Sequence, residues 1–186
     1  MTKCLGIIGG IAPESTIDYY RQIIARHRLI SGKYPQIIIN SIDLEKMLGL
    51  VVAGDRDAFA TYMCDEISRL ARAGAEVGLI SSNTPHIVFD EIRRRSPIPM
   101  VSIAEAAAAT AVARKYKRVG LFATRFVMRG GFYGEVFARS GITVVLPQEA
   151  EQDYVHAKYI GELVNGRYSG ELVNGIFLPE TREGFL

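Results

Sequence analysis

The feature that most constrains the fold is an alternation between short apolar runs rich in β-branched residues and longer segments with helical periodicity. This order is typical of α/β proteins, in which each helix returns the chain so that the next strand joins the sheet in parallel. The fold class is therefore predicted to be α/β, with doubly wound parallel sheets. Strands are expected at residues 4–8, 36–40, 77–81, 100–103, 117–123 and 143–146, and helices at 14–30, 57–73, 85–95, 104–115, 130–139 and 149–165.

A long-range repeat indicates two similar lobes. Residues 3–8 (KCLGII) and 117–122 (KRVGLF) share the pattern Lys, any residue, apolar, Gly, apolar, apolar, and the same offset carries Tyr19 onto Tyr133. The alternative explanation is the general likeness of strand–loop–helix units. Because prolines at 97 and 99 interrupt the chain, the lobes are expected at residues 1–97 and 98–186.

The C-terminal part of the sequence is unusual. The segment GELVNG occurs at residues 161–166 and again at 170–175, which indicates a small duplication in a surface connection. A further helix is expected to begin near Pro179, and a doubly wound lobe normally follows such a helix with another strand. The second lobe is therefore expected to be incomplete at its C-terminus.

Composition excludes several classes of function. The formal net charge is +2, and the densest cationic cluster, residues 93–95 (RRR), falls in the last turn of a predicted helix, where it offsets the helix dipole. Nucleic-acid binding is therefore not expected. A membrane association is not expected either, because no apolar run reaches ~18–20 residues. Cys4 and Cys64 make neither a metal-ligand spacing nor a disulfide framework, which predicts a cytoplasmic protein without a metal.

The main candidate site is residues 82–86 (SNTPH), where a predicted strand turns into a helix. Ligands of open α/β sheets bind beyond the carboxyl ends of the strands. Pro85 suits the first helical position, which predicts Thr84 as the N-cap and leaves backbone amides free. Free amides, hydroxyls and the side-chain amide of Asn83 suit a carboxylate. Helix capping alone is the alternative, because any strand-to-helix turn prefers these residues.

Small residues follow two other predicted strands. Gly10 and Ile11 come after the first strand, and Thr124 holds the equivalent place in the second lobe. Such residues would leave room for a ligand between the lobes. The glycines of residues 6–10 do not match G-x-G-x-x-G and no P-loop lysine is present, so no nucleotide cofactor is expected.

In this order and spacing, the sequence resembles the aspartate/glutamate racemase family of cofactor-independent amino-acid racemases. The resemblance covers nearly the whole chain and rests on residues 6–10 (GIIGG), 14–16 (EST), 19–20 (YY), 82–86 (SNTPH), 120–124 (GLFAT), 132–133 (FY), Pro147 and residues 162–163 (EL). It implies two similar α/β lobes with the active site in the cleft between them, and no cofactor. It also implies a two-base mechanism, in which one residue removes the α-proton and another delivers a proton to the opposite face.

The resemblance also implies roles for individual residues. The substrate would be a small amino acid or carboxylate, with Ser82 in the first proton-transfer position. The residues expected to bind the substrate are Gly10, Ile11, Asn83, Thr84 and Thr124. In the family, the first position is usually a cysteine in a C-N-T-x-H motif. The second is a cysteine in a G-C-T-E motif, expected beyond the end of this sequence.

A serine in the first position changes the expected chemistry. A thiol with a pKa near 8.5 can be tuned into a base, whereas a serine hydroxyl is far more basic and needs a neighbouring base. In the motif only His86, about one helical turn away, offers such a base. Cys4 in a predicted strand and Cys64 on the polar side of a predicted helix offer no substitute.

Three functions therefore stay open from the sequence: an amino-acid racemase, a catalytically impaired carboxylate-binding homologue, and a related decarboxylase or isomerase. Family members with acidic substrates carry basic residues after the second strand and in the helix ending at Gly166. Here those segments offer only Lys46 and Lys158, so a dicarboxylate preference does not follow. The oligomeric state is open as well, with a homodimer as one option.

Overall fold

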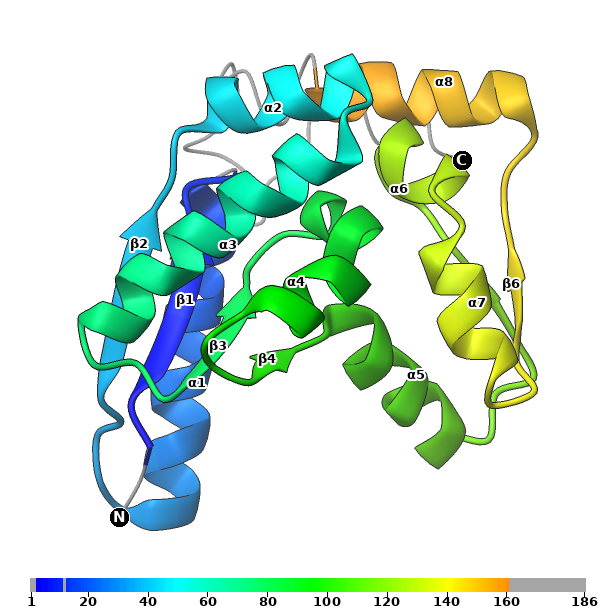
Figure 1. Ribbon diagram of the computed structural model, residues 1–186. Coiled ribbons are helices and arrows are strands. Elements are labelled where there is room, and N and C mark those ends of the chain that lie inside the picture. Colours follow the sequence, from blue (N-terminus) through cyan, green and yellow to red (C-terminus); the bar gives the residue numbers. More distant parts are fainter. Residues whose placement is uncertain (1–2, 12, 161–186) are drawn as a thin grey trace. The chain divides into compact units, whose positions relative to one another are not determined.

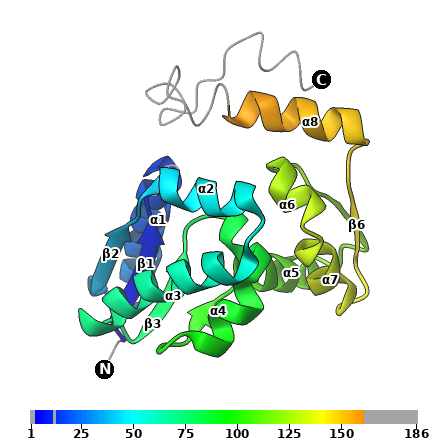
Figure 2. The same ribbon diagram turned by 45° about the horizontal axis from the view of Figure 1, so that its top comes forward.

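The computed structural model describes residues 3–11 and 13–160, and the chain divides into two compact units, Met1–Thr110 and Ala111–Leu186 (Figures 1 and 2). In the first unit a four-stranded parallel sheet has the order β2-β1-β3-β4, and in the second β5 pairs with β6 in parallel. The predicted α/β class with parallel sheets is confirmed.

The sheet of the first unit is built around β1 (Leu5–Gly9). It pairs with β2 (Ile37–Ser41) on one side and with β3 (Val77–Ile80) on the other, and β4 (Met100–Val101) follows β3. The chain thus builds the sheet first to one side of β1 and then to the other. Ligands of open α/β proteins bind at such a switch point, beyond the carboxyl ends of the strands.

Helices cover both faces of this sheet. Figure 1 shows α1 (Pro13–Ser31) behind β1 and α3 (Arg56–Arg72) in front of it. The apolar stripe of α3 is buried, and it forms one core with residues of β1, β3 and α4 (Phe89–Arg95). The largest fully buried side chains of this core are those of Ile8, Met47, Met63, Ile67, Leu70, Ile80, Val88 and Ile92.

The first unit differs from the expected elements in two places. The helix α2 (Leu44–Ala53) was not predicted, although the Asp43 carboxylate accepts a hydrogen bond from the Lys46 N–H at 3.0 Å and caps it. The helix predicted at residues 85–95 is two elements, the 3₁₀ helix η1 (Thr84–Val88) and α4 (Phe89–Arg95). The helical backbone is interrupted at Val88, where φ is −116° and ψ is 25°.

The first unit also extends past the boundary expected after Pro97. Because β4 pairs with β3, it belongs to the first sheet, and the division between the units falls within α5 (Ile103–Ala113).

The second unit contains β5 (Arg118–Gly120) and β6 (Thr143–Val145). Its helices are α6 (Arg125–Arg129), α7 (Phe132–Ala138) and α8 (Glu149–Lys158). The five-residue α6 was not predicted, because so short a helix shows no apolar period. The GELVNG repeat and the helix expected near Pro179 lie outside the described residues. Among the helices that the structure describes, none has the length and apolar character to cross a membrane.

Candidate functional site

The candidate site of the first unit lies at the switch point between β1 and β3. Gly10 and Ile11 follow β1, and residues 82–84 follow β3 after Ser81. Because the two strands are adjacent and parallel, their carboxyl ends bring these segments to the same edge of the sheet. The structure therefore brings together the site residues that the sequence predicted in the first unit.

The turn at residues 82–84 does not have the predicted helix start. Asn83, and not Thr84, precedes the helix, its backbone is already helical, and no side chain caps the helix. The His86 N–H donates to the Asn83 carbonyl at 3.0 Å, as a tight 3₁₀ turn requires. The prediction of Thr84 as N-cap was therefore wrong, and the carboxylate site cannot rest on a free helix N-terminus. Ser82 and Asn83 are partly exposed, whereas Thr84 is buried.

A hydrogen bond from the side chain of His86 stabilises the turn at residues 82–84. The Ile103 N–H donates to Nε2 of His86 at 3.1 Å, so Nδ1 carries the ring proton and donates to the Ser82 carbonyl at 3.0 Å. The ring is 2% exposed and stacks on Phe89 with 4.7 Å between centroids. Burial is the main cause that lowers its pKa to about 4, so the imidazole is neutral at pH 7. With its lone pair already accepting a hydrogen bond, His86 positions Ser82 and does not act as its base.

The β1–α1 loop contributes backbone to the site. Gly10 has a φ of +84°, and a Cβ there would lie 2.6 Å from Ser41 Oγ and 2.7 Å from the Ile42 carbonyl oxygen. Glycine is therefore required at this position by both conformation and space. The side chain of Ile11 packs into the hydrophobic core, which leaves its backbone for contact with a ligand.

The hydroxyl groups of three residues, for which the sequence indicated no role, connect the two segments. Ser15 and Thr16, in the first turn of α1, bond to the carbonyl and the hydroxyl of Ser81 at 2.7 and 2.9 Å. The sequence signal was the Ser-Thr pair shortly after Gly9 and Gly10, but its partner lies 65 residues away along the chain.

In the second unit, Thr124 directly precedes α6, and residues 121–123 separate it from β5, the strand that corresponds to β1 in the predicted repeat. Its Oγ1 is buried and, among the described residues, has no hydrogen-bond partner. A buried unsatisfied hydroxyl costs about 1–3 kcal/mol, which a ligand oxygen that accepts its proton would recover.

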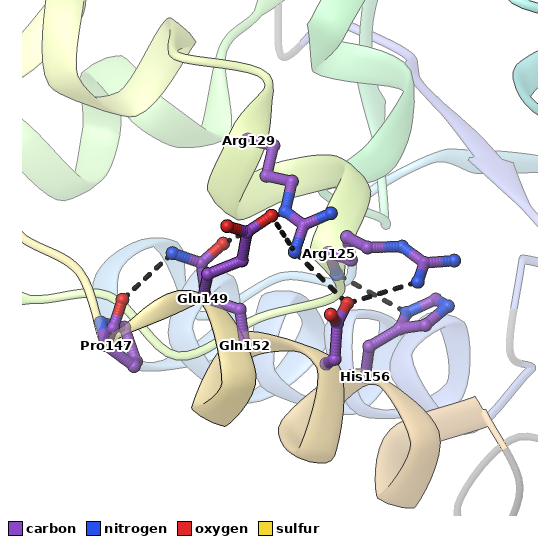
Figure 3. Close-up of polar contacts among 7 residues, drawn as sticks. Arg125, Arg129, Pro147, Glu149, Gln152 and His156 are labelled. Atoms are coloured by element: carbon purple, nitrogen blue, oxygen red, sulfur yellow. Dashed lines mark hydrogen bonds and ion pairs between the residues drawn. The ribbon is translucent and has the colours of Figure 1, made fainter.

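The helix that follows Thr124 is anchored to α8 (Figure 3). The Arg125 N–H donates to Nδ1 of His156 at 3.3 Å, and the guanidinium groups of Arg125 and Arg129 each contact Asp153 Oδ1 at 3.1 Å. The hydrogen bond from Arg125 is the main cause that lowers the pKa of Asp153. Burial, followed by the charge of Arg125, lowers the pKa of His156 and so favours the neutral ring that can accept from the Arg125 N–H.

Comparison with known proteins identifies the family. The family model described as Asp/Glu/Hydantoin racemase matches residues 8–174. The chain belongs to this family. It is similar to the broad specificity amino-acid racemase RacX of Bacillus subtilis (strain 168), with 22% identity over 146 residues, which are 76% of this chain and 63% of RacX. The chain thus spans less than two thirds of that curated relative.

Two solved structures share the fold of this racemase-family chain at higher identity. A candidate Asp/Glu racemase from Yersinia pestis is 31% identical, with a TM-score of 0.82 over 99% of this chain and 77% of the other. An aspartate racemase homologue from Pyrococcus horikoshii OT3 is 32% identical, with a TM-score of 0.74 over 94% of this chain and 78% of the other.

The racemase-family chain has no thiol at this site. Cys64 was expected on the polar side of α3, but it is buried in the core, and burial raises the pKa of its thiol. Cys4 lies just before β1, at the opposite end of that strand from Gly10. Within the described part of the chain, no group of three or more His, Cys, Asp or Glu side chains gathers that could hold a metal ion.

Proposed function

We propose that this racemase-family chain exchanges the α-proton of a small amino acid without a cofactor, with Ser82 in the first proton-transfer position. The residues that would bind the substrate are Gly10, Ile11, Asn83, Thr84 and Thr124. The observation that carries the proposal is the placement of Ser82 at the β1/β3 switch point, with its carbonyl held by the buried His86 at 3.0 Å. A proton-transfer group has to be held rigidly against the substrate to be effective.

Carboxylate binding is supported by the polar groups that follow the strands. Asn83 and Thr84 follow β3, and Thr124 offers a buried hydroxyl without a partner among the described residues. Donors that bind the α-carboxylate would also stabilise the negative charge that spreads onto it when the α-proton leaves. Lys46 lies over the ring of Tyr62 at 4.7 Å and Lys158 over that of Tyr154 at 5.9 Å, so we assign neither to a substrate side chain.

The proton-transfer step itself would be slow. A serine hydroxyl needs a base to ionise it, and the tautomer of His86 removes the base that the motif offered. Ser82 would then only relay the α-proton, through a bound water, to hydroxide in the solvent, which serves as the base. A two-base exchange also needs a donor on the opposite face of the substrate, and we assign none within the described residues.

The same tautomer favours a second candidate, a catalytically impaired homologue that binds carboxylates. In that case the Ser82 turn and the Thr124 hydroxyl would bind an amino acid or carboxylate without turnover. In either case we propose a cytoplasmic protein with a small free ligand, without nucleic acid or membrane, and a homodimer as the assembly to test by light scattering.

Substitution of Ser82 by cysteine tests the proposal. We expect slow exchange of the α-proton of L-aspartate or L-glutamate into D₂O by the native chain, exchange at least about 10-fold faster in Ser82→Cys, and slower exchange in Ser82→Ala. Ser68→Cys, which adds a thiol on α3, is the matched control and leaves the rate unchanged. An unchanged rate in Ser82→Cys would contradict the proposed role of Ser82.

Binding distinguishes the two candidates. If no variant exchanges the α-proton while carboxylates still raise the melting temperature, the binding-only homologue is the correct function. Ligand binding to the folded state alone raises stability by mass action, so this readout does not depend on turnover.

A further inference from the structure

We propose that Ser15, Thr16 and Ser81 are positioning residues that fix the Ser82 turn and the β1–α1 loop at a set distance from each other. The consequence for catalysis rests on the proposed function, whereas the positioning itself does not. None of the three was assigned a role from the sequence, and two of them are nearly inaccessible: Thr16 is 7% exposed and Ser81 is 2% exposed.

The hydrogen bonds of Thr16 and Ser81 form a chain with one direction. The Ile8 carbonyl can only accept, so the Ser81 hydroxyl donates to it at 3.1 Å. Ser81 Oγ therefore accepts from the Thr16 hydroxyl at 2.9 Å, and Thr16 Oγ1 accepts from the Gly10 N–H at 3.3 Å. These hydrogen bonds connect the β1–α1 loop to α1, α1 to the end of β3, and the end of β3 back to β1.

The hydrogen bonds of Thr16 and Ser81 fix the loop that follows β1. A Cβ at Gly9 would lie 2.6 Å from Cγ2 and 2.7 Å from Oγ1 of Thr16, so the threonine side chain rests directly on the glycine backbone. On its other side the loop meets Ser41 and Ile42, next to Gly10. Since the Gly10 N–H is directed to Thr16, a ligand at the loop would meet other backbone groups.

Ser15 fixes the backbone at Ser82 itself. Its hydroxyl donates to the Ser81 carbonyl at 2.7 Å, which belongs to the peptide group joining Ser81 to Ser82. His86 holds the next carbonyl, that of Ser82, at 3.0 Å. Both peptide groups that flank the Ser82 side chain are therefore held, one from α1 and one from η1.

The alternative is that these hydroxyls only stabilise the start of α1. In that case their loss would lower stability in general, without a specific effect on the Ser82 turn. The two explanations differ in what happens at residues 82–84, which lie on a different element from Thr16.

Two measurements on three variants separate the explanations. In Thr16→Val, which keeps the shape and removes the hydroxyl, we expect amide hydrogen exchange at residues 82–84 to become at least about 10-fold faster. We also expect kcat for α-proton exchange to fall about 10- to 100-fold with KM changed less than about 3-fold, because misplacement of a reacting group acts on the rate. Thr16→Ser restores the hydroxyl and should return both quantities to within about 3-fold of the native chain.

The control is Ser68→Ala, which removes a half-buried hydroxyl that donates to the Cys64 carbonyl within α3. It should leave amide exchange at residues 82–84 and kcat unchanged. Unchanged amide exchange at residues 82–84 in Thr16→Val would overturn the positioning role, whatever the activity. If amide exchange becomes faster in Thr16→Val but the native chain itself shows no α-proton exchange, the proposed function fails and the positioning role stands.

Discussion

The two units treat the polar groups that follow their strands in opposite ways. In the first unit, hydroxyls of α1 and the ring of His86 hold the backbone around Ser82. In the second unit, Thr124 Oγ1 is buried without a partner among the described residues. The difference teaches that one segment is organised before a ligand arrives, whereas the other keeps an unsatisfied group that a ligand could complete.

The strands of the two units also differ in how deeply they are buried. Within the described residues, β1 has a strand on each side and is buried over residues 6–9. The pair β5–β6 has one neighbour per strand and alternates exposed and half-buried residues. A two-stranded pair is marginal by itself, so the described part of the second unit depends more on its helices.

Core truncations give the largest expected contrast. Ile67→Ala on α3 should lower the free energy of unfolding by about 3 kcal/mol, because Ile67 is fully buried in the first unit's core. Val119→Ala on β5 should cost only about 1 kcal/mol, because its side chain is half-buried. Urea unfolding followed by circular dichroism measures both, and equal losses would contradict the contrast in packing.

A fall in pH should lower the stability of the first unit, because the unfolded chain protonates His86 more readily than the folded chain does. Its pKa in the folded state, about 4, lies below the usual value of 6.5, so the unfolded chain binds the proton first as the pH falls. This group's stabilisation is complete above pH 6.5 and is lost progressively down to about pH 4, by about 3 kcal/mol in total.

NMR of the ring protons measures that titration directly, and His86→Asn assigns the signal. The difference in unfolding free energy between the native chain and His86→Asn should also shrink between pH 6.5 and 4. A ring that titrates near 6.5 would mean that burial does not hold His86 in the neutral form.

Removal of the Thr124 hydroxyl should have a small effect on stability, with the opposite sign. Thr124→Val should raise the free energy of unfolding by about 1 kcal/mol, because it removes a buried group without a partner, and it should weaken carboxylate binding. Thermal unfolding with and without L-aspartate measures both. Thr110→Val, which removes a hydroxyl bonded to the Ala106 carbonyl in α5, is the control and should leave binding unchanged. A loss of stability in Thr124→Val would show that the hydroxyl already has a partner.

Much of the first unit could be predicted from local patterns. The strands β1 and β3 and the helix α3 have strong periods, because each contributes buried residues to the core. The helix α1 was predicted as well, although Ile17 and Tyr20 on its apolar face are exposed in the structure. The missed helix α2 is capped by Asp43, and it carries too few turns for its period to stand out. The prediction of Thr84 as the N-cap was wrong because Pro85 lies in a 3₁₀ turn. Residue preferences at a helix start do not distinguish such a turn from an α-helix.

The sequence by itself determined the α/β class and the likeness to the racemase family, and it predicted a site after β3 with Ser82 in the first proton-transfer position. All of these depend on periods and motifs that are continuous in the chain. Only the tertiary structure decided the tautomer of His86, since its partner, the Ile103 N–H, lies 17 residues away. It also joined Thr16 to Ser81 across 65 residues, because parallel strands bring the ends of distant segments to one edge of the sheet.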